Sequence, residues 1–276
     1  MKYAQKLKKG LSVKSLDLDY WRELRAAGVD CVELSCDFAT YMDTLDFPNS
    51  AELYAENAAR AGLEIWSIHL PFSREHDISN ADKGLRENIL EANRRLIEAA
   101  GRIGIKTAVL HPSSEPIKDE ERAERIRLSK EGIRYLKDAA DKANVVLAVE
   151  NLPRTCLCNT ASEMIELLSG TGAAAVFDTN HSLEQDNLSF LSELALAGIT
   201  VWSLHISDYD FIDERHRLPG LGINDWNGIL SALERAGYGG PLMYEIAFSS
   251  RDNDPKYTVT LDMLKENMEK LAAGEL

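Results

Sequence analysis

The sequence predicts an α/β protein built as a single (β/α)8 TIM barrel, and three observations support this. Short apolar runs alternate with helical stretches along the chain, and eight such units fit into its 276 residues. No Gly-x-Gly-x-x-Gly motif follows the first run, which disfavours a dinucleotide-binding open sheet. Strand–helix alternation implies parallel strands joined by helical crossovers. We therefore expect one barrel domain over residues 1–276, a usual size for this architecture.

Eight apolar runs are the predicted strands, and the clearest of them has the continuous apolar pattern of a strand buried on both faces. In chain order they are Leu11–Val13, Cys31–Leu34, Ile65–His69, Thr107–His111, Val145–Glu150, Ala173–Asp178, Val201–Ile206 and Leu242–Ile246. Several of the helical stretches between them end near a glycine, as helix C-termini often do. These glycines are Gly28, Gly62, Gly104, Gly170, Gly198 and Gly237.

Composition excludes several classes of protein. The formal net charge of −14 opposes nonspecific attraction to nucleic acid or to an anionic membrane surface. No apolar stretch reaches the roughly 18 to 20 residues of a membrane span, and the N-terminus lacks the apolar segment of a secretory signal. The four cysteines follow neither a disulfide nor a zinc-finger spacing. We expect a soluble cytoplasmic protein that does not bind nucleic acid or membranes.

Six of the predicted strands, the third to the eighth, end in or beside a side chain that can bind a metal. These side chains are His69, His111, Glu150, Asp178, His205 and Glu245. The C-terminal ends of barrel strands converge on one face, so these residues should lie together. One such residue is most often a capping or hydrogen-bonding group, but six in succession are not readily explained that way. Imidazole and carboxylate ligands suit divalent Zn, Mn, Fe or Co, and carboxylate-rich sites suit Mn or Mg.

Glu150 is the clearest of these signals. It follows the apolar run Val145–Val149, so its carboxylate is expected next to the core. Burial of an unpaired charge costs several kcal/mol or shifts the pKa of the group. A bound cation would compensate that charge, and the sequence leaves the identity of the ion open.

Two loops extend the expected site. The "DTNH" segment places His181 three residues beyond Asp178. The segment "SDYDFIDERHRLPGLGINDW" after the seventh strand contains Glu214 and His216, and it can lie over the barrel mouth. The competing interpretation is an ordinary solvated crossover, in which Asp225 caps the next helix.

The chain resembles the xylose isomerase-like TIM-barrel superfamily, which contains sugar isomerases, ketose 3-epimerases and endonuclease IV-type DNA repair enzymes. The resemblance rests on "SIHLPF", "AVLHPSS", "AVENLPR", "FDTNH", "LHISDYD", "HRLPGLGINDW" and "MYEI", in this order and spacing. For the epimerase branch, the resemblance implies a metal site of Glu150, Asp178, His205 and Glu245. It places His181 near the substrate hydroxyls.

The endonuclease IV pattern is also partly present. Positions that hold metals in those trinuclear zinc enzymes match His69, His111, Glu150, Asp178, His181, His205, His216 and Glu245. Glu214 departs from the pattern, because the Asp-x-His motif of those enzymes has aspartate there. The "HRLPGLGINDW" motif and the net negative charge of the chain favour the sugar branch.

The resemblance implies a metal-dependent isomerase or epimerase of a sugar or sugar phosphate. Glu150 and Glu245 would be the catalytic pair that moves a proton through an enediolate, with the metal polarising the carbonyl. Substrate binding or a second metal is expected at His69, His111, His181, Glu214 and His216. Two alternatives remain open at this point: a zinc-dependent abasic-site DNA phosphodiesterase, and a noncatalytic sugar-binding barrel. The sequence leaves open whether the protein forms a homo-oligomer.

Overall fold

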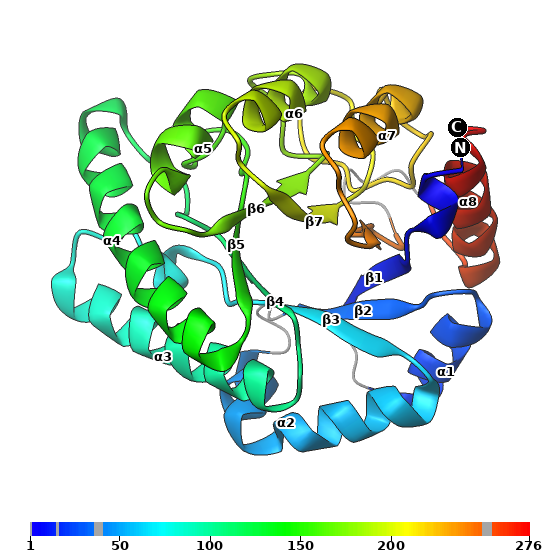
Figure 1. The fold of residues 1–276 in the computed structure, drawn as a ribbon, viewed down its shortest axis with the longest axis horizontal. Helices are drawn as coiled ribbons and strands as arrows, with labels where there is room; N and C mark the ends of the chain where they lie inside the picture. The colour runs from blue at the N-terminus through cyan, green and yellow to red at the C-terminus, as the bar shows by residue number, and fades with distance from the viewer. Residues whose placement is uncertain (1, 15–16, 36–40, 250–255) are drawn as a thin grey trace.

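The protein was studied as a computed structural model that describes residues 2–14, 17–35, 41–249 and 256–276. Within these residues the eight predicted strands are parallel neighbours in the order β7-β6-β5-β4-β3-β2-β1-β8. Helices surround the strands on the outside (Figure 1). The predicted (β/α)8 TIM barrel is therefore confirmed.

The strands are short and the helices longer, as usual for this fold. The strands are β1 (Lys9–Val13), β2 (Cys31–Ser35), β3 (Glu64–His69), β4 (Thr107–Leu110), β5 (Val146–Glu150), β6 (Ala174–Asp178), β7 (Val201–His205) and β8 (Leu242–Tyr244). The helices are α1 (Leu18–Ala26), α2 (Tyr41–Ala61), α3 (Lys83–Arg102), α4 (Asp119–Ala143), α5 (Ala161–Leu168), α6 (Asn187–Leu196), α7 (Trp226–Arg235) and α8 (Leu261–Ala273). Two 3-10 turns, η1 (Ala4–Lys6) and η2 (Arg74–His76), complete the elements.

The predicted strand ends are corrected by one or two residues at several places. His111 lies one residue beyond β4, and Glu245 lies one residue beyond β8. In both cases the chain leaves the regular ladder where it turns into the loop at the barrel mouth. Both side chains still line the same cavity as Glu150.

The barrel closes between β7 and β8 through residues just past the regular ladder. The Ile206 amide donates to the Met243 carbonyl over 2.8 Å, and the Glu245 amide donates to the Ile206 carbonyl over 3.2 Å. This bridge fixes Glu245 beside the C-terminal end of β7. It therefore brings Glu245 close to His205, the last residue of that strand.

Helix ends follow the sequence signals. The Asp225 carboxylate accepts the Gly228 amide at the start of α7, which confirms the expected cap. All six glycines expected after helices adopt a positive φ. Gly237 illustrates the reason: its φ of 73° turns the chain sharply after α7, a conformation that costs glycine little.

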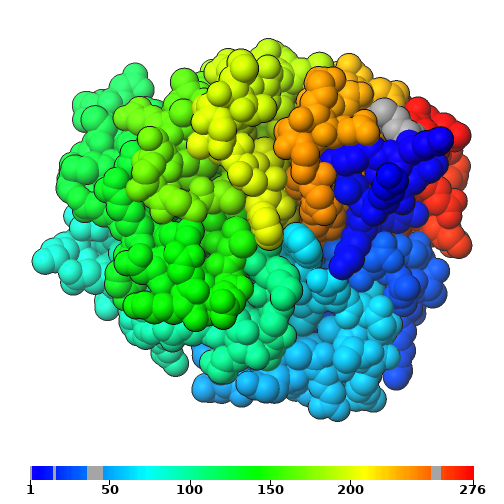
Figure 2. Space-filling model, in the orientation of Figure 1, coloured from blue at the N-terminus to red at the C-terminus, as the bar shows by residue number. Residues whose placement is uncertain are grey.

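The core consists of two parts. A large cluster packs the strands against the helices, and a small one of Val109, Ala148 and Val176 fills the barrel interior. Cys31, Cys156 and Cys158 are buried free thiols, and Cys36 lies outside the described residues. Among the described residues, no helix is both long and apolar enough to span a membrane. The N-terminal segment lies beside α7 and α8 near the C-terminus (Figure 2).

Candidate metal centre

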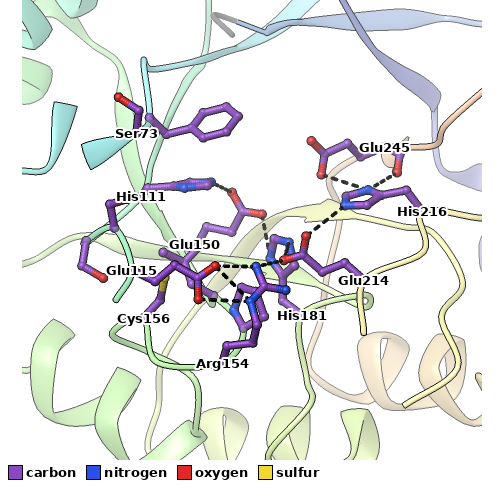
Figure 3. Close-up of a pocket in the computed structure, with 15 residues that line it drawn as sticks. Ser73, His111, Glu115, Glu150, Arg154, Cys156, His181, Glu214, His216 and Glu245 are labelled. Carbon is purple, nitrogen blue, oxygen red and sulfur yellow. Dashed lines mark hydrogen bonds and ion pairs between the residues drawn. The ribbon is translucent and has the colours of Figure 1, made fainter. Parts of the chain in front are cut away.

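The expected site residues gather at the C-terminal ends of the strands. Six of these nine residues line a cavity of about 260 Å³ (Figure 3). Its walls include His111, Glu150, His181, Glu214, His216 and Glu245. His69, Asp178 and His205 are buried beneath these side chains. The structure thus brings all nine sequence-predicted residues into one region.

Glu150 occupies the centre of this region, and its two oxygens face different groups of residues. Oε2 lies 3.2 Å from Nε2 of His69 and 3.2 Å from Nε2 of His111. Oε1 lies 2.9 Å from Nδ1 of His205 and 3.4 Å from Nδ1 of His181. Its carboxylate is fully buried, so the four imidazoles replace the solvation that it has lost. These contacts explain how a buried glutamate can be accommodated at the end of a core strand.

Two groups of possible metal ligands share Glu150. His69, His111 and Glu150 form one group. Glu150, Asp178, His205 and Glu245 form the other. Within each group, one ligand atom of every residue lies within 4.8 Å of those of the others. Glu150 would therefore be a ligand common to both groups if each held an ion.

Asp178 supplies an observation that fits a cation in the second group. One oxygen, Oδ1, accepts the Asn180 amide over 2.6 Å. The other, Oδ2, is buried, and it has no hydrogen-bond partner among the described residues. Buried carboxylate oxygens are normally satisfied, so an unpartnered one among three other ligands fits a metal position.

A third group, His181, Glu214 and His216, joins two loops. Oε1 of Glu214 lies 3.7 Å from Nε2 of His181, and Oε2 of Glu214 lies 3.8 Å from Nε2 of His216. These three residues also offer ligand atoms within 4.8 Å of one another. The interpretation of Glu214 as a residue of a solvated crossover is therefore wrong, because its side chain is mostly buried against the site.

The imidazole rings are oriented by acceptors behind them. Nδ1 of His69, His181 and His216 lies 3.0, 2.9 and 3.0 Å from the carbonyls of Leu70, Asn151 and Glu245, respectively. Each Nδ1–H can donate to that carbonyl, and in the neutral ring Nε2 is then the nitrogen that could bind a cation. Metal-binding histidines are commonly held in this way. The orientation of these rings is compatible with metal binding.

The charges of these groups influence one another strongly. Burial alone would raise the pKa of Glu150, but the positive charges of His205 and His111 outweigh it and hold that pKa well below its usual range. Burial lowers the pKa of His205, but Glu33, Glu150 and Glu245 together raise it well above its ordinary value. Burial, followed by the charges of Glu245 and Glu150, raises the pKa of Asp178.

Glu245 remains ionised in these surroundings. Burial would raise its pKa, but the charges of His205 and His216 lower it to about 2. A carboxylate that stays negative at neutral pH can act as a ligand or as a base. Both roles of Glu245 stay predictions.

The sequence interpretation missed Glu33, which lies within β2. Its side chain is fully buried, and Oε1 lies 2.9 Å from Nε2 of His205. Oε2 accepts a hydrogen bond of 2.7 Å from the hydroxyl of Ser67. The signal was present in "CVELS", where a charged residue lies inside an apolar run, whereas Glu150 lies at the end of one.

Arg154 was also given no role, although it follows Glu150 by four residues. Its guanidinium pairs with Glu115, Asp213 and Glu214 at 2.8, 2.8 and 3.1 Å, respectively. Three different loops are thereby tied together along the cavity wall, as the contacts to Glu115 and Glu214 show (Figure 3). No regular sequence period links these loops, so the pattern gave no sign of this cluster.

The loop after β7 is held over the site by buried polar side chains. Asn180 accepts the amides of Arg215 and His216 over 3.1 and 3.3 Å. Asp208, which is fully buried, accepts the Gly220 amide over 2.8 Å and the Trp226 indole N–H over 2.9 Å. His216 itself has a φ of 49°, a backbone conformation that costs about 1 kcal/mol or more in a non-glycine residue. The predicted position of this loop at the barrel mouth is confirmed.

The fold and the site together define a (β/α)8 barrel with a histidine–carboxylate centre at the C-terminal ends of its strands. The sequence matches the xylose isomerase-like TIM barrel family over residues 21–267. The chain belongs to that family, as its motifs indicated.

Named relatives share this fold along nearly their whole length. L-ribulose-5-phosphate 3-epimerase UlaE of Shigella flexneri is 24% identical over 274 residues, which cover 94% of this chain and 92% of the relative. The crystal structure of D-psicose 3-epimerase with D-tagatose from Clostridium cellulolyticum H10 superposes with a TM-score of 0.79 at 18% identity, covering 98% of each chain. A structure of L-ribulose 3-epimerase gives a TM-score of 0.77 at 20% identity, covering 98% of this chain and 94% of the other.

Proposed function

We propose that this protein is a metal-dependent epimerase or isomerase of a ketose or ketose phosphate. The observation that carries the proposal is the group formed by Glu150, Asp178, His205 and Glu245, in which Oδ2 of Asp178 is buried and accepts no hydrogen bond from the described residues. The names of the relatives, which are 3-epimerases of ketoses or of a ketose phosphate, agree with this assignment. Epimerisation at C3 is therefore the first reaction to test.

Glu150 and Glu245 are the proposed acid–base pair. A divalent ion held by the four residues would polarise the substrate carbonyl and stabilise the charge of an enediolate. Glu150 comes from β5 and Glu245 follows β8, so the two carboxylates approach the cavity from different sides of the barrel. One removes a proton next to the carbonyl and the other returns it. Removal of the C3 proton and return to the opposite face of C3 gives the 3-epimer, whereas removal from C1 and return at C2 gives an aldose.

The remaining site residues are proposed to bind substrate hydroxyls or a second cation. His111, His181 and His216 line the open cavity, where a sugar can reach them. Imidazole nitrogens can donate or accept hydrogen bonds to hydroxyls according to their tautomer. Glu214 lies between His181 and His216, so a bound sugar and a second ion would compete for the same atoms.

A panel of ketopentoses and ketohexoses, with and without a 5- or 6-phosphate, tests the proposal. Purified protein is loaded in turn with Mn²⁺, Co²⁺, Zn²⁺ or Mg²⁺, and products are separated by chromatography and identified by NMR. Reactions in D₂O should place deuterium at the inverted carbon. Full activity after exhaustive removal of metal would overturn the metal dependence. Sugar binding without turnover at full metal occupancy would indicate a noncatalytic barrel.

A second candidate is an abasic-site DNA phosphodiesterase of the endonuclease IV type. The observation that favours it is the presence of three ligand groups, including His181, Glu214 and His216. Against it stand the net charge of −14 and the cavity wall, whose one lysine or arginine among the described lining residues, Arg154, is neutralised by acidic partners. Three bound zinc ions together with nicking of abasic duplex DNA would establish this activity. The absence of turnover of any sugar would then exclude the epimerase assignment.

We further propose that residues 1–276 act as one domain with a small sugar as its partner. The family match covers residues 21–267 without a break, and the strands form one continuous barrel. Limited proteolysis that releases no stable fragment from the native protein would support this assignment.

A further inference from the structure

Glu33 is a buried carboxylate that the proposed reaction does not use. It lies inside β2, and its side chain has no exposure to solvent. Among the residues that the structure describes, His205 is its one charged partner within 4.0 Å. A buried negative charge with a single partner depends strongly on that partner.

Two neighbours position the Glu33 carboxylate. Strand pairing sets Glu33 opposite Ser67 of β3, and the Ser67 hydroxyl donates to Oε2 over 2.7 Å. This bond leaves Oε1 facing Nε2 of His205 at 2.9 Å. The Nε2–H bond of His205 would not point at Oε1 of Glu33. Both atoms therefore lack a hydrogen-bond partner among the described residues. The contact therefore acts mainly through charge.

The opposite nitrogen of His205 faces the proposed metal ligands. Nδ1 lies 2.9 Å from Oε1 of Glu150 and 3.4 Å from Oε2 of Glu245. A neutral imidazole carries one proton, and the ring can bind a metal only through the nitrogen that lacks it. In this structure Nδ1 is hydrogen-bonded to Glu150, so an ion can bind there only if the proton lies on Nε2, where the negative charge of Glu33 favours it.

We propose that Glu33 is a positioning residue that, when a divalent ion takes the place at Nδ1 of His205, stabilises the ring proton on Nε2 and so leaves the Nδ1 lone pair to the ion. This inference rests on the proposed metal function. Carboxylates behind metal-binding imidazoles commonly act in this way, and their removal costs about 10- to 100-fold in metal affinity or activity.

The test measures Zn²⁺ affinity by chelator competition for the wild-type protein, Glu33→Gln and Ser67→Ala. Glu33→Gln keeps the size of the side chain but removes its charge, and we expect the Kd for Zn²⁺ to rise about 10- to 100-fold. Ser67→Ala removes a hydrogen bond to Glu33 and keeps the charge, so its Kd should change by less than about threefold. Unfolding followed in excess EDTA checks that both variants are folded. A Kd for folded Glu33→Gln within twofold of wild type would overturn the proposal.

A second measurement does not depend on any variant being folded. In wild-type protein loaded with Zn²⁺, ¹⁵N-histidine NMR reports which ring nitrogen of His205 carries the proton. We expect a protonated Nε2 and a metal-bound Nδ1, whereas the reverse assignment would overturn the role of Glu33. If the wild-type protein binds no Zn²⁺ at all, the proposed metal function fails, and the role of Glu33 fails with it. Binding with the reverse tautomer removes only the role of Glu33.

Discussion

Oε1 of Glu150 and Nδ1 of His205 lie 2.9 Å apart, although 55 residues separate them in the chain. Glu150 ends β5 and His205 ends β7, and both side chains are fully buried. Asp178, the last residue of β6, comes from the strand between them. Three consecutive strands thus deliver three possible ligands to one point, and this arrangement underlies the predictions that follow.

Asp178→Asn should remove most metal binding. The substitution keeps the shape of the side chain but replaces a carboxyl group whose Oδ2 has no hydrogen-bond partner among the described residues. We expect the affinity for Mn²⁺ or Zn²⁺ to fall at least about 100-fold. Removal of a residue that only orients a metal ligand already lowers metal affinity by about 10- to 100-fold. Isothermal titration calorimetry measures this directly. Asp186→Asn, at the exposed N-cap of α6, is the matched control and should bind metal as the wild type does.

Glu245→Gln separates proton transfer from metal binding. The variant retains one oxygen donor but loses the base, so it is assayed at saturating metal with occupancy measured. Turnover and solvent deuterium incorporation should both fall by about 10²- to 10⁴-fold, the usual contribution of a general acid–base group. Glu234→Gln, on the exposed surface of α7, serves as control. Near-normal turnover at full occupancy would exclude Glu245 from catalysis.

His216→Ala should weaken substrate or second-metal binding and leave the fold intact. The residue lies in a loop, where it contributes little to the barrel core. We expect KM or the Kd of a second ion to rise about tenfold, corresponding to roughly 1.4 kcal/mol. His216→Asn keeps an N–H that can reach the Glu245 carbonyl but removes Nε2, so it distinguishes ligand loss from displacement of Glu245. Unchanged kinetics and metal content in both variants would contradict a role for His216 in binding.

In EDTA, the protein should be most stable at mildly acidic pH. The raised pKa of His205 means that its protonation stabilises the fold below the ordinary value of 6.5, and this contribution is lost as pH rises through the folded pKa. The depressed pKa of Glu245 stabilises the fold above the ordinary value of 4.5 and is lost as pH falls toward 2. The free energy of unfolding, measured in urea from pH 4 to 8.5, should therefore peak between about 4.5 and 6.5.

Added Zn²⁺ should shift this optimum upward. Metal ligands bind in their deprotonated forms, so the proton on His205 competes with the ion and binding strengthens as pH rises. At a free Zn²⁺ concentration of 100 times Kd, the stabilisation is about 2.7 kcal/mol. The same urea titrations with and without the ion measure the shift. An optimum that stays in place when Zn²⁺ is bound would contradict the assignment of His205 as a ligand.

An uncharged ketose should be preferred over its phosphate. Arg154 is the one lysine or arginine among the described residues that line the cavity, and Glu115 and Asp213 already bind it. A phosphate would have to displace these carboxylates. We expect kcat/KM to favour the uncharged ketose by at least about tenfold, roughly 1.4 kcal/mol. The variant Glu115→Gln with Asp213→Asn should narrow that ratio, and a preference of the wild type for the phosphate would contradict the argument.

The fold was predictable because local patterns repeat along the chain. The apolar runs and their spacing identify eight strand–helix units, and the direction of the strands follows from the helical crossovers. The same logic located Glu150 and Asp178, since each ends an apolar run and the C-terminal ends of barrel strands converge. A ligand at the end of a strand is a local feature, and the sequence determined it.

The partners of each ligand depended on contacts that no local pattern encodes. Strand register sets Glu33 opposite Ser67, and closure of the barrel brings Glu33 near His205, 172 positions later in the chain. Arg154 meets Glu115 and Asp213 only because their loops leave the same end of the barrel. The sequence alone determined that the side chains at the strand ends reach the barrel mouth. The tertiary structure decided which of them meet and which ring nitrogen faces the site, because both depend on distances across the barrel.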